Sequence, residues 1–122
     1  MAGTAPVRGL VGLAGPYAFQ PLDYASVRPI FQDAADVDDA RPVTFACRST
    51  VPRLLLHGDA DTVVVPANSR ALHKKSADCK VRSRYRSLDG VNHYEILLGL
   101  SSTFQRRGPV VEEIMTFLAS LD

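Results

Sequence analysis

An acidic turn and a histidine turn hold the residue types that acid-base chemistry needs. Asp59 and Asp61 follow three consecutive leucines at positions 54–56, and His93 stands 32 residues after Asp61. A carboxylate that accepts the N–H of a histidine ring fixes the tautomer of the ring and stabilises the imidazolium that forms when the histidine takes a proton. Acid followed by histidine is the order of two members of a nucleophilic triad. The spacing therefore predicts an Asp-His pair that serves a nucleophile.

The acidic turn is predicted to join a buried strand to a helix. The leucine run is too short for a helix, is apolar on both faces and is bounded by Pro52 and Gly58, which indicates a buried parallel strand. Pro66 suits the first position of a helix, where its missing N–H is not needed, and a helix is predicted over residues 67–76. A second strand is predicted over residues 80–87. The carboxyl ends of the two strands then place Asp61 and His93 at one sheet edge.

Two further elements complete the predicted order. Residues 7–14 form an apolar run that ends at Gly15 and Pro16 and is predicted to be a strand. Its glycines do not match G-x-G-x-x-G, which opens a helix in dinucleotide-binding proteins, and close packing of neighbouring backbone accounts for them. A C-terminal helix is indicated by one apolar stripe after Pro109, made of Val110, Val111, Ile114, Phe117, Leu118 and Leu121. Strands alternating with helices predict an α/β fold with a parallel sheet.

With residues 54–64 (LLLHGDADTVV) and 90–93 (GVNH), the chain resembles the α/β-hydrolase family, in particular its carboxylesterase and lipase-like branch. The resemblance covers nearly the whole chain but only the second half of that fold. It implies one partial domain over residues 1–122, the C-terminal half of an α/β-hydrolase fold, with about three parallel strands and flanking helices. The family places its catalytic acid third after the glycine, which selects Asp61 over Asp59 and leaves Asp59 to hydrogen-bond the turn. His93 takes the place of the base, and Asn92 stands where the family more commonly has glycine, a residue whose left-handed φ asparagine tolerates.

The nucleophile is missing from the sequence pattern. No serine or cysteine stands in G-x-S-x-G or at another sharp strand-to-helix turn, and Ser101 and Ser102 lie beyond the histidine. The run 7–14 resembles the strand that follows the nucleophile helix in the family, so the serine and the oxyanion donors are expected upstream of it. We therefore expect a second copy of the chain, or a separate N-terminal half, to cover the apolar edge of the first strand.

Residues 16–50 form an excursion without clean periodicity. The excursion carries a cluster of acidic residues between Asp33 and Asp39, which is expected to be a solvated face or a set of helix caps because a metal site needs a tighter ligand pattern. In the family an insertion at this point commonly forms a cap over the active site, and the alternative is a surface excursion pinned to the core. The aromatic residues that either arrangement would use are Tyr17, Phe19, Tyr24, Phe31 and Phe45.

Structural roles are the main expectation for two other histidines and three arginines. His57 is expected at the end of a strand, and His73 to face solvent on a helix. Arg82, Arg84 and Arg86 alternate along a strand, where they either contact phosphates or keep a peripheral strand from pairing with other chains.

Composition limits the classes of partner. The chain of 122 residues is 46% apolar and 22% charged with a net charge of +1, so bulk charge does not indicate a nucleic-acid partner. No apolar run reaches the roughly 18 residues of a membrane span, and no targeting segment is seen, which predicts a cytoplasmic protein. Cys47 and Cys79 lack C-x-x-C or Cys/His spacing, so unpaired cysteines are expected, without a zinc site, other metal site or cofactor.

The prediction is an esterase-type hydrolase of small carboxylic esters that carries Asp61 and His93 but lacks the serine. The alternative is a non-catalytic half-domain that self-associates or binds a partner. A response-regulator-like domain is a third reading, but its phosphoacceptor aspartate should follow an early strand, and the first strand here ends in Gly15 and Pro16.

Overall fold

The computed structural model describes residues 5–103 and 109–122, so the first residues of the expected 1–122 domain lie outside the described part. The strands are β1 (Leu10–Leu13), β2 (Arg53–Gly58) and β3 (Ser83–Leu88), and the α-helices are α1 (Arg28–Phe31), α2 (Ala67–Asp78), α3 (Glu95–Leu98) and α4 (Val110–Ala119). Three short 3₁₀ helices, η1 (Pro21–Asp23), η2 (Val37–Ala40) and η3 (Pro42–Phe45), lie in the excursion. No helix within the described ranges is long and apolar enough to cross a membrane.

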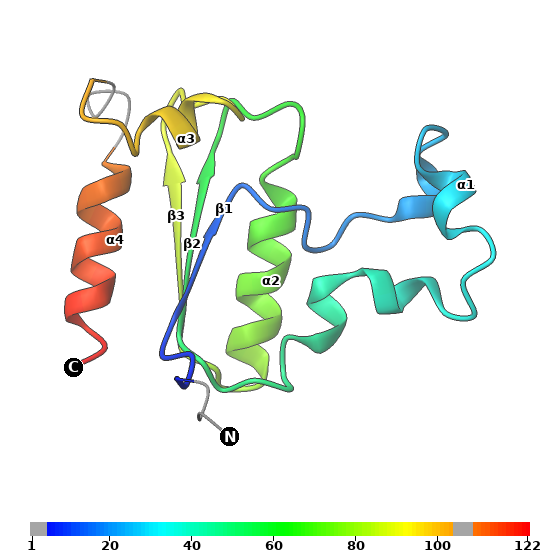
Figure 1. The fold of residues 1–122 in the computed structure, drawn as a ribbon, viewed down its shortest axis with the longest axis horizontal. Coiled ribbons are helices and arrows are strands. Elements are labelled where there is room, and N and C mark those ends of the chain that lie inside the picture. The colour runs from blue at the N-terminus through cyan, green and yellow to red at the C-terminus, as the bar shows by residue number, and fades with distance from the viewer. Residues whose placement is uncertain (1–4, 104–108) are drawn as a thin grey trace.

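The three strands form one parallel sheet in the order β1-β2-β3. Leu10 pairs with Arg53, and Arg53 pairs in turn with Ser83, so the strands start in register. Helix α4 covers one face of the sheet and α2 covers the other (Figure 1). The expected α/β architecture of about three parallel strands with flanking helices is confirmed. The first strand is shorter than the expected run 7–14: it begins only at Leu10 and ends at Leu13, after which Ala14 still donates its N–H to Leu56 O but has a φ of 51°.

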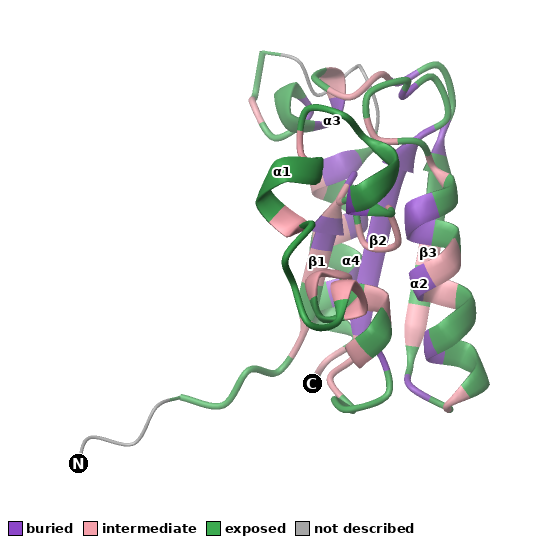
Figure 2. Cartoon of the chain, turned by 90° about the vertical axis from the view of Figure 1, so that its right-hand side faces the viewer, coloured by how far each residue is buried: buried purple, intermediate pink, exposed green. Residues whose placement is uncertain are grey.

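The leucine run supplies the core on both sides of the sheet. Leu54 and Leu56 pack with Phe117 on the α4 side, whereas Leu55 packs with Leu72 on the α2 side. All six residues of β2 are buried, which Figure 2 shows as a purple strand between the less buried β1 and β3. A strand apolar on both faces belongs in the middle of a parallel sheet covered by helices, and this explains why the sequence alone located it.

Helix α4 departs from its predicted stripe at two positions. Val110 and Phe117 are buried as expected, but Leu118 is 46% exposed. Glu113 is buried instead, because Arg84 and Arg86 of β3 each approach its carboxylate at 3.0 Å. Arg84 and Arg86 therefore lie on the α4 side of the sheet, and Arg82, just before β3, bonds the carbonyl oxygen of Ser120, just after α4.

Two predictions about residues around α2 are wrong. Cys47 and Cys79 are not free thiols but form a disulfide with a Cα–Cα distance of 5.7 Å, which ties the end of the excursion to the C-terminus of α2. His73 does not simply face solvent, since its Nδ1 lies 2.9 Å from Ser83 Oγ and its ring lies beside Tyr85. Cys79 meets a residue of the excursion, whereas His73 meets the strand β3 that follows its own helix.

Candidate active site

The acidic loop and the histidine loop lie against each other at the carboxyl ends of β2 and β3. The N–H of Asp59 donates to Leu88 O, and the N–H of Ala60 donates to Val91 O. Gly58 permits this approach, because a Cβ at that position would overlap the carbonyl group of Val91. Because Gly58 has no side chain at the end of β2, the loop that carries His93 can lie directly against that end of the strand.

Asp61 and His93 form a direct pair. Asp61 Oδ2 lies 2.8 Å from Nδ1 of His93, and the Asp61 side chain is fully buried while that of His93 is 27% exposed. Asp61 Oδ1 accepts from the N–H groups of Val63 at 3.0 Å and Val64 at 2.9 Å. The carboxylate is therefore held from two sides and aims one oxygen at the ring.

The pKa of Asp61 lies below its ordinary value. Burial, the largest single influence, would raise it, but the bond to His93, the amides of Val64 and Val63 and the charge of His93 together lower it. The ionised form is the one that these donors favour. An ionised Asp61 accepts the Nδ1–H of His93, which leaves Nε2 as the basic nitrogen of the neutral ring.

His57 supports the same carboxylate from inside the fold. It is fully buried in β2, its Nδ1 lies 2.7 Å from Ser69 Oγ, and its Nε2 lies 2.7 Å from Val64 O and 3.2 Å from Asp61 Oδ2. Because a carbonyl oxygen only accepts, Nε2 of His57 carries the proton. His57 therefore ties the acidic loop to α2, a role that its expected place at a strand end did not specify.

Asp59 and Asn92 shape the two loops. Asp59 Oδ1 accepts from the N–H of Gly90 at 2.7 Å, at the turn where Gly90 has a φ of +67°. Asn92 Oδ1 accepts from the N–H groups of Tyr94 and Glu95 at the start of α3. Asn92 does not have a positive φ, so it does not serve as a left-handed residue. Its side chain instead caps the first N–H groups of α3. The cap fixes the backbone next to His93.

No nucleophile meets His93 within the part of the chain that the structure describes. No serine or cysteine side chain in residues 5–103 and 109–122 is hydrogen-bonded to its ring, and Ser101 bonds the N–H of Thr103 instead. The same residues contain no group of three or more His, Cys, Asp or Glu side chains suited to a metal ion.

An apolar hollow lies beside the acidic loop. It has a volume of about 390 Å³ and lies between residues 63–65 of that loop and the excursion residues Phe19, Tyr24 and Val27. Two of the aromatic residues of the excursion therefore face the segment that follows Asp61. A hollow of this size is of the order that small-molecule sites have.

Comparison with known proteins relates this geometry to solved structures. No protein-family model matches the chain, and no curated protein matches it. A truncated form of a carbohydrate esterase from gut microbiota superposes with a TM-score of 0.63 over 87% of this chain, at 18% identity. The fold is the C-terminal half of an α/β-hydrolase fold. A puromycin-hydrolysing peptidase from Mycobacterium tuberculosis superposes with a TM-score of 0.59 over 70% of the chain, at 24% identity.

The half-fold spans only a part of each neighbour. It matches 42% of the carbohydrate esterase chain and 15% of the peptidase chain. Both neighbours are hydrolases by name, which agrees with the coarse resemblance to hydrolases, whereas the roles of individual residues rest on the geometry of Asp61 and His93.

Proposed function

We propose that this chain carries the acid and the base of a Ser-His-Asp triad in an esterase-type hydrolase of small carboxylic esters. The observation that carries the proposal is the 2.8 Å contact between Asp61 Oδ2 and His93 Nδ1 at the carboxyl ends of neighbouring parallel strands. A buried, ionised carboxylate on Nδ1 makes Nε2 the base. The ester substrate class comes from the resemblance to the carboxylesterase branch.

In the proposed mechanism His93 transfers one proton in each of two half-reactions. Its Nε2 takes the proton of a serine hydroxyl as the serine oxygen attacks the ester carbonyl, and the imidazolium then gives that proton to the departing alcohol. Water then attacks the acyl-serine while Nε2 takes its proton, and the imidazolium gives that proton to the departing serine oxygen as the acyl–oxygen bond breaks, which releases the carboxylic acid and restores the serine. Asp61 stays ionised throughout and stabilises the imidazolium. Hydroxyl nucleophile and oxyanion donors come from another polypeptide segment.

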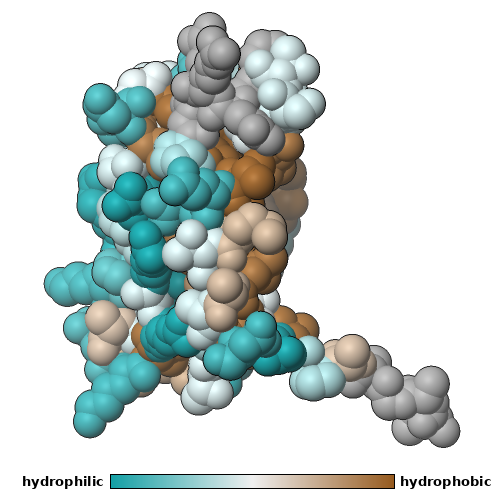
Figure 3. Space-filling view, turned by 90° about the vertical axis from the view of Figure 1, so that its left-hand side faces the viewer, coloured by the Kyte–Doolittle hydropathy of each residue, from teal (hydrophilic) through white to brown (hydrophobic). Residues whose placement is uncertain are grey.

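The edge of β1 is the place where that segment would pack. The N–H of Leu10 donates to Pro52 O, just before β2, and that of Ala14 donates to Leu56 O, so the N–H groups of Val11 and Leu13 point to the opposite edge of the strand. Apolar side chains gather along one side of the molecular face in Figure 3, and the exposed apolar residues of α3 and α4 are Leu97, Leu98, Met115 and Leu118. An unpaired strand beside exposed apolar surface is a template for pairing with another strand. The partner is a second copy or an N-terminal half-domain.

A non-catalytic half-domain is the second candidate. It is favoured by the same open edge together with the lack, within the described ranges, of a nucleophile on His93. In that case the chain self-associates or binds a partner through β1.

The cap-like role of residues 16–50 and the cytoplasmic location are likewise predictions. The Cys47–Cys79 disulfide weighs against the latter, because disulfides persist mainly in oxidising compartments.

The proposal is tested in a chimera of this chain with the carbohydrate esterase. In the chimera this chain takes the place of the part of the carbohydrate esterase that it matches, 42% of that chain. Hydrolysis of a short-chain nitrophenyl ester by the chimera is measured. Asp61→Asn is expected to lower kcat by about 10³ to 10⁴, as in serine-protease triads. Asp59→Asn is the matched control and is expected to cost far less, because Asp59 bonds Gly90 and not His93. Equal losses in the two variants would contradict the assignment.

The unmodified chain gives the complementary result. It is expected neither to turn over the ester nor to be labelled by a fluorophosphonate, which reacts with activated serines. A labelled serine in the chain alone would show that the nucleophile lies within it, across a contact between copies.

A further inference from the structure

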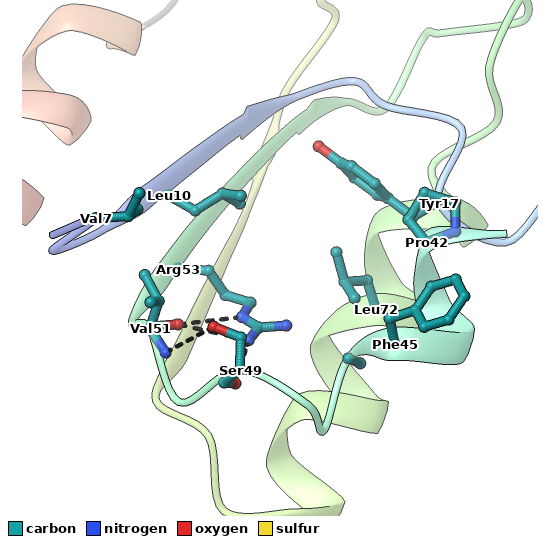
Figure 4. A pocket seen from close by; sticks show the side chains of 10 residues that line it. Val7, Leu10, Tyr17, Pro42, Phe45, Ser49, Val51, Arg53 and Leu72 are labelled. Atoms are coloured by element: carbon teal, nitrogen blue, oxygen red, sulfur yellow. Dashed lines mark hydrogen bonds between the residues drawn. The ribbon is translucent and has the colours of Figure 1, made fainter. Parts of the chain in front are cut away.

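A second apolar pocket lies at the opposite end of β2 from Asp61 and His93. It has a volume of about 400 Å³. Its walls come from the start of β1 and the residues before it, the excursion, the start of β2 and the loop before it, and helix α2 (Figure 4). The lining includes the side chains of Leu10, Tyr17, Phe45, Arg53 and Leu72. Arg53 is the first residue of β2 and His93 follows the end of β3, so the pocket is separate from the candidate active site.

Arg53 is a buried cation without an anion. Its residue is 7% exposed, and its Nε and Nη2 donate to the carbonyl oxygens of Val51 at 3.4 Å and Ser49 at 3.0 Å. Among the described residues, no carboxylate pairs with it and no acceptor bonds its Nη1. Figure 4 shows the guanidinium bonded on the Val51 side and open toward the space that Leu72 and Phe45 border.

Burial without an anion weakens the charged state. Desolvation lowers the pKa of Arg53 from its usual value. Taking a cation out of water is costly unless a negative partner and further hydrogen bonds offset the loss of hydration. The backbone carbonyls accept hydrogen bonds from only some of the five N–H groups of the guanidinium. An anion in the pocket would supply the rest.

We propose that this pocket binds a monocarboxylate with an apolar body, such as a medium-chain alkanoate. The carboxylate lies at Nη1 of Arg53, and the hydrocarbon lies against Tyr17, Phe45 and Leu72. A charge-assisted bond at a desolvated guanidinium is among the stronger hydrogen bonds, and the remaining wall is almost wholly apolar. Pocket volume and chemistry are those of a small-molecule site, mostly apolar with one orienting charge.

The disulfide holds one wall of the pocket in place. Cys47 follows Phe45 and Ala46, which line the pocket, and its bond to Cys79 fixes that segment on α2, which contributes Leu72. Ala46 and Leu72 also share one buried cluster with Leu55. The site is therefore pre-formed, and less ordering is needed when a ligand binds.

Calorimetric titration of the intact chain with octanoate tests the proposal. Saturable binding is expected, weaker for hexanoate and butyrate because less hydrocarbon is buried, and weaker by about tenfold or more for octanol because it lacks the charge. Arg53→Met removes the cation, keeps an apolar side chain, and is expected to weaken octanoate binding by about tenfold or more. Arg70→Met, at an exposed position of α2, removes the same charge elsewhere and is expected to leave binding unchanged.

A spectroscopic readout keeps the test independent of the folding of Arg53→Met. Octanoate is expected to shift the Arg53 Nε–H resonance of the unaltered chain, whereas octanol leaves it in place. No saturable octanoate binding, equal affinity for octanol and octanoate, or an Arg53 resonance that octanoate does not move would each overturn the proposal. None of these results depends on Asp61 or His93, so this proposal and the proposed function fail separately.

Discussion

The carbonyl group of Val91 occupies the space into which a Cβ on Gly58 would project. This close approach of two backbones lets the histidine loop lie on the end of β2, where Ala60 N–H bonds Val91 O at 3.1 Å. The distance between Asp61 and His93 is set by this contact, since both residues lie within three positions of it.

Gly58→Ala is expected to destabilise the fold by about 1–3 kcal/mol, because the clash is with backbone and neither chain segment can move aside without breaking sheet hydrogen bonds. Denaturant unfolding measures the loss. Gly90→Ala is the control: its φ of +67° is unfavourable for alanine, but no atom lies within 4 Å of the added group. A Gly58→Ala variant as stable as the unaltered chain would contradict the close approach.

Reduction of Cys47–Cys79 is expected to lower the free energy of unfolding. The cysteines are 32 residues apart in sequence, and in the chain-entropy model a loop of that size corresponds to about 3–4 kcal/mol. Urea unfolding with and without reductant measures the difference, and the Cys47→Ser, Cys79→Ser double variant should match the reduced chain. A urea midpoint that reductant does not change, or a double variant as stable as the oxidised chain, would argue against the bond.

The lowered pKa of Asp61 predicts a pH dependence of stability. A carboxyl group with a lower pKa in the folded state contributes stability that is complete above its unfolded value, for which 3.8 is the reference. That contribution is lost as the pH falls from there through the folded pKa. The stability difference between the unaltered chain and Asp61→Asn is therefore expected to shrink below about pH 3.8. Denaturant unfolding at a series of pH values tests this, and a constant difference would contradict it.

Glu113→Gln is expected to destabilise the packing of α4 on β3. The side chain of Glu113 is 10% exposed, whereas those of Arg84 and Arg86 are 49% and 48% exposed, so water screens the arginines once the carboxylate is removed. The expected loss is about 1–2 kcal/mol rather than that of a fully buried pair. Glu112→Gln, at the neighbouring exposed position, is the matched control and is expected to be near neutral. Equal effects of the two substitutions would remove the ion pairs from the account.

Local patterns predicted the elements that place the candidate site. Three leucines apolar on both faces located β2, and Pro66 located the start of α2, although the structure makes Pro66 the N-cap and begins the helix at Ala67. The spacing of Asp61 and His93 then predicted that they share a sheet edge, because parallel strands bring their carboxyl ends together.

Features that depend on distant segments were not predictable in this way. Cys79 meets Cys47 only because the excursion folds back on α2, and Glu113 looks like an ordinary acidic residue in a first turn until β3 presents two arginines to it. The buried state of Arg53 likewise requires the excursion and α2 to enclose the start of β2. Each of these features depends on which elements pack against each other in the folded chain. The local pattern of apolar and polar residues does not carry that information.

If Asp61 makes His93 a base at Nε2, the neutral ring of His93 carries its proton on Nδ1, and the tautomer of the ring reports this. Long-range ¹H–¹⁵N NMR of the unaltered chain, at a pH where the ring is neutral, distinguishes the nitrogen that carries the proton. The Nδ1–H tautomer is expected, with Nδ1–H donating a hydrogen bond to the ionised Asp61, and a shift toward the Nε2–H tautomer is expected in Asp61→Asn, because the introduced amide can donate to Nδ1. An Nε2–H tautomer in the unaltered chain would contradict the account.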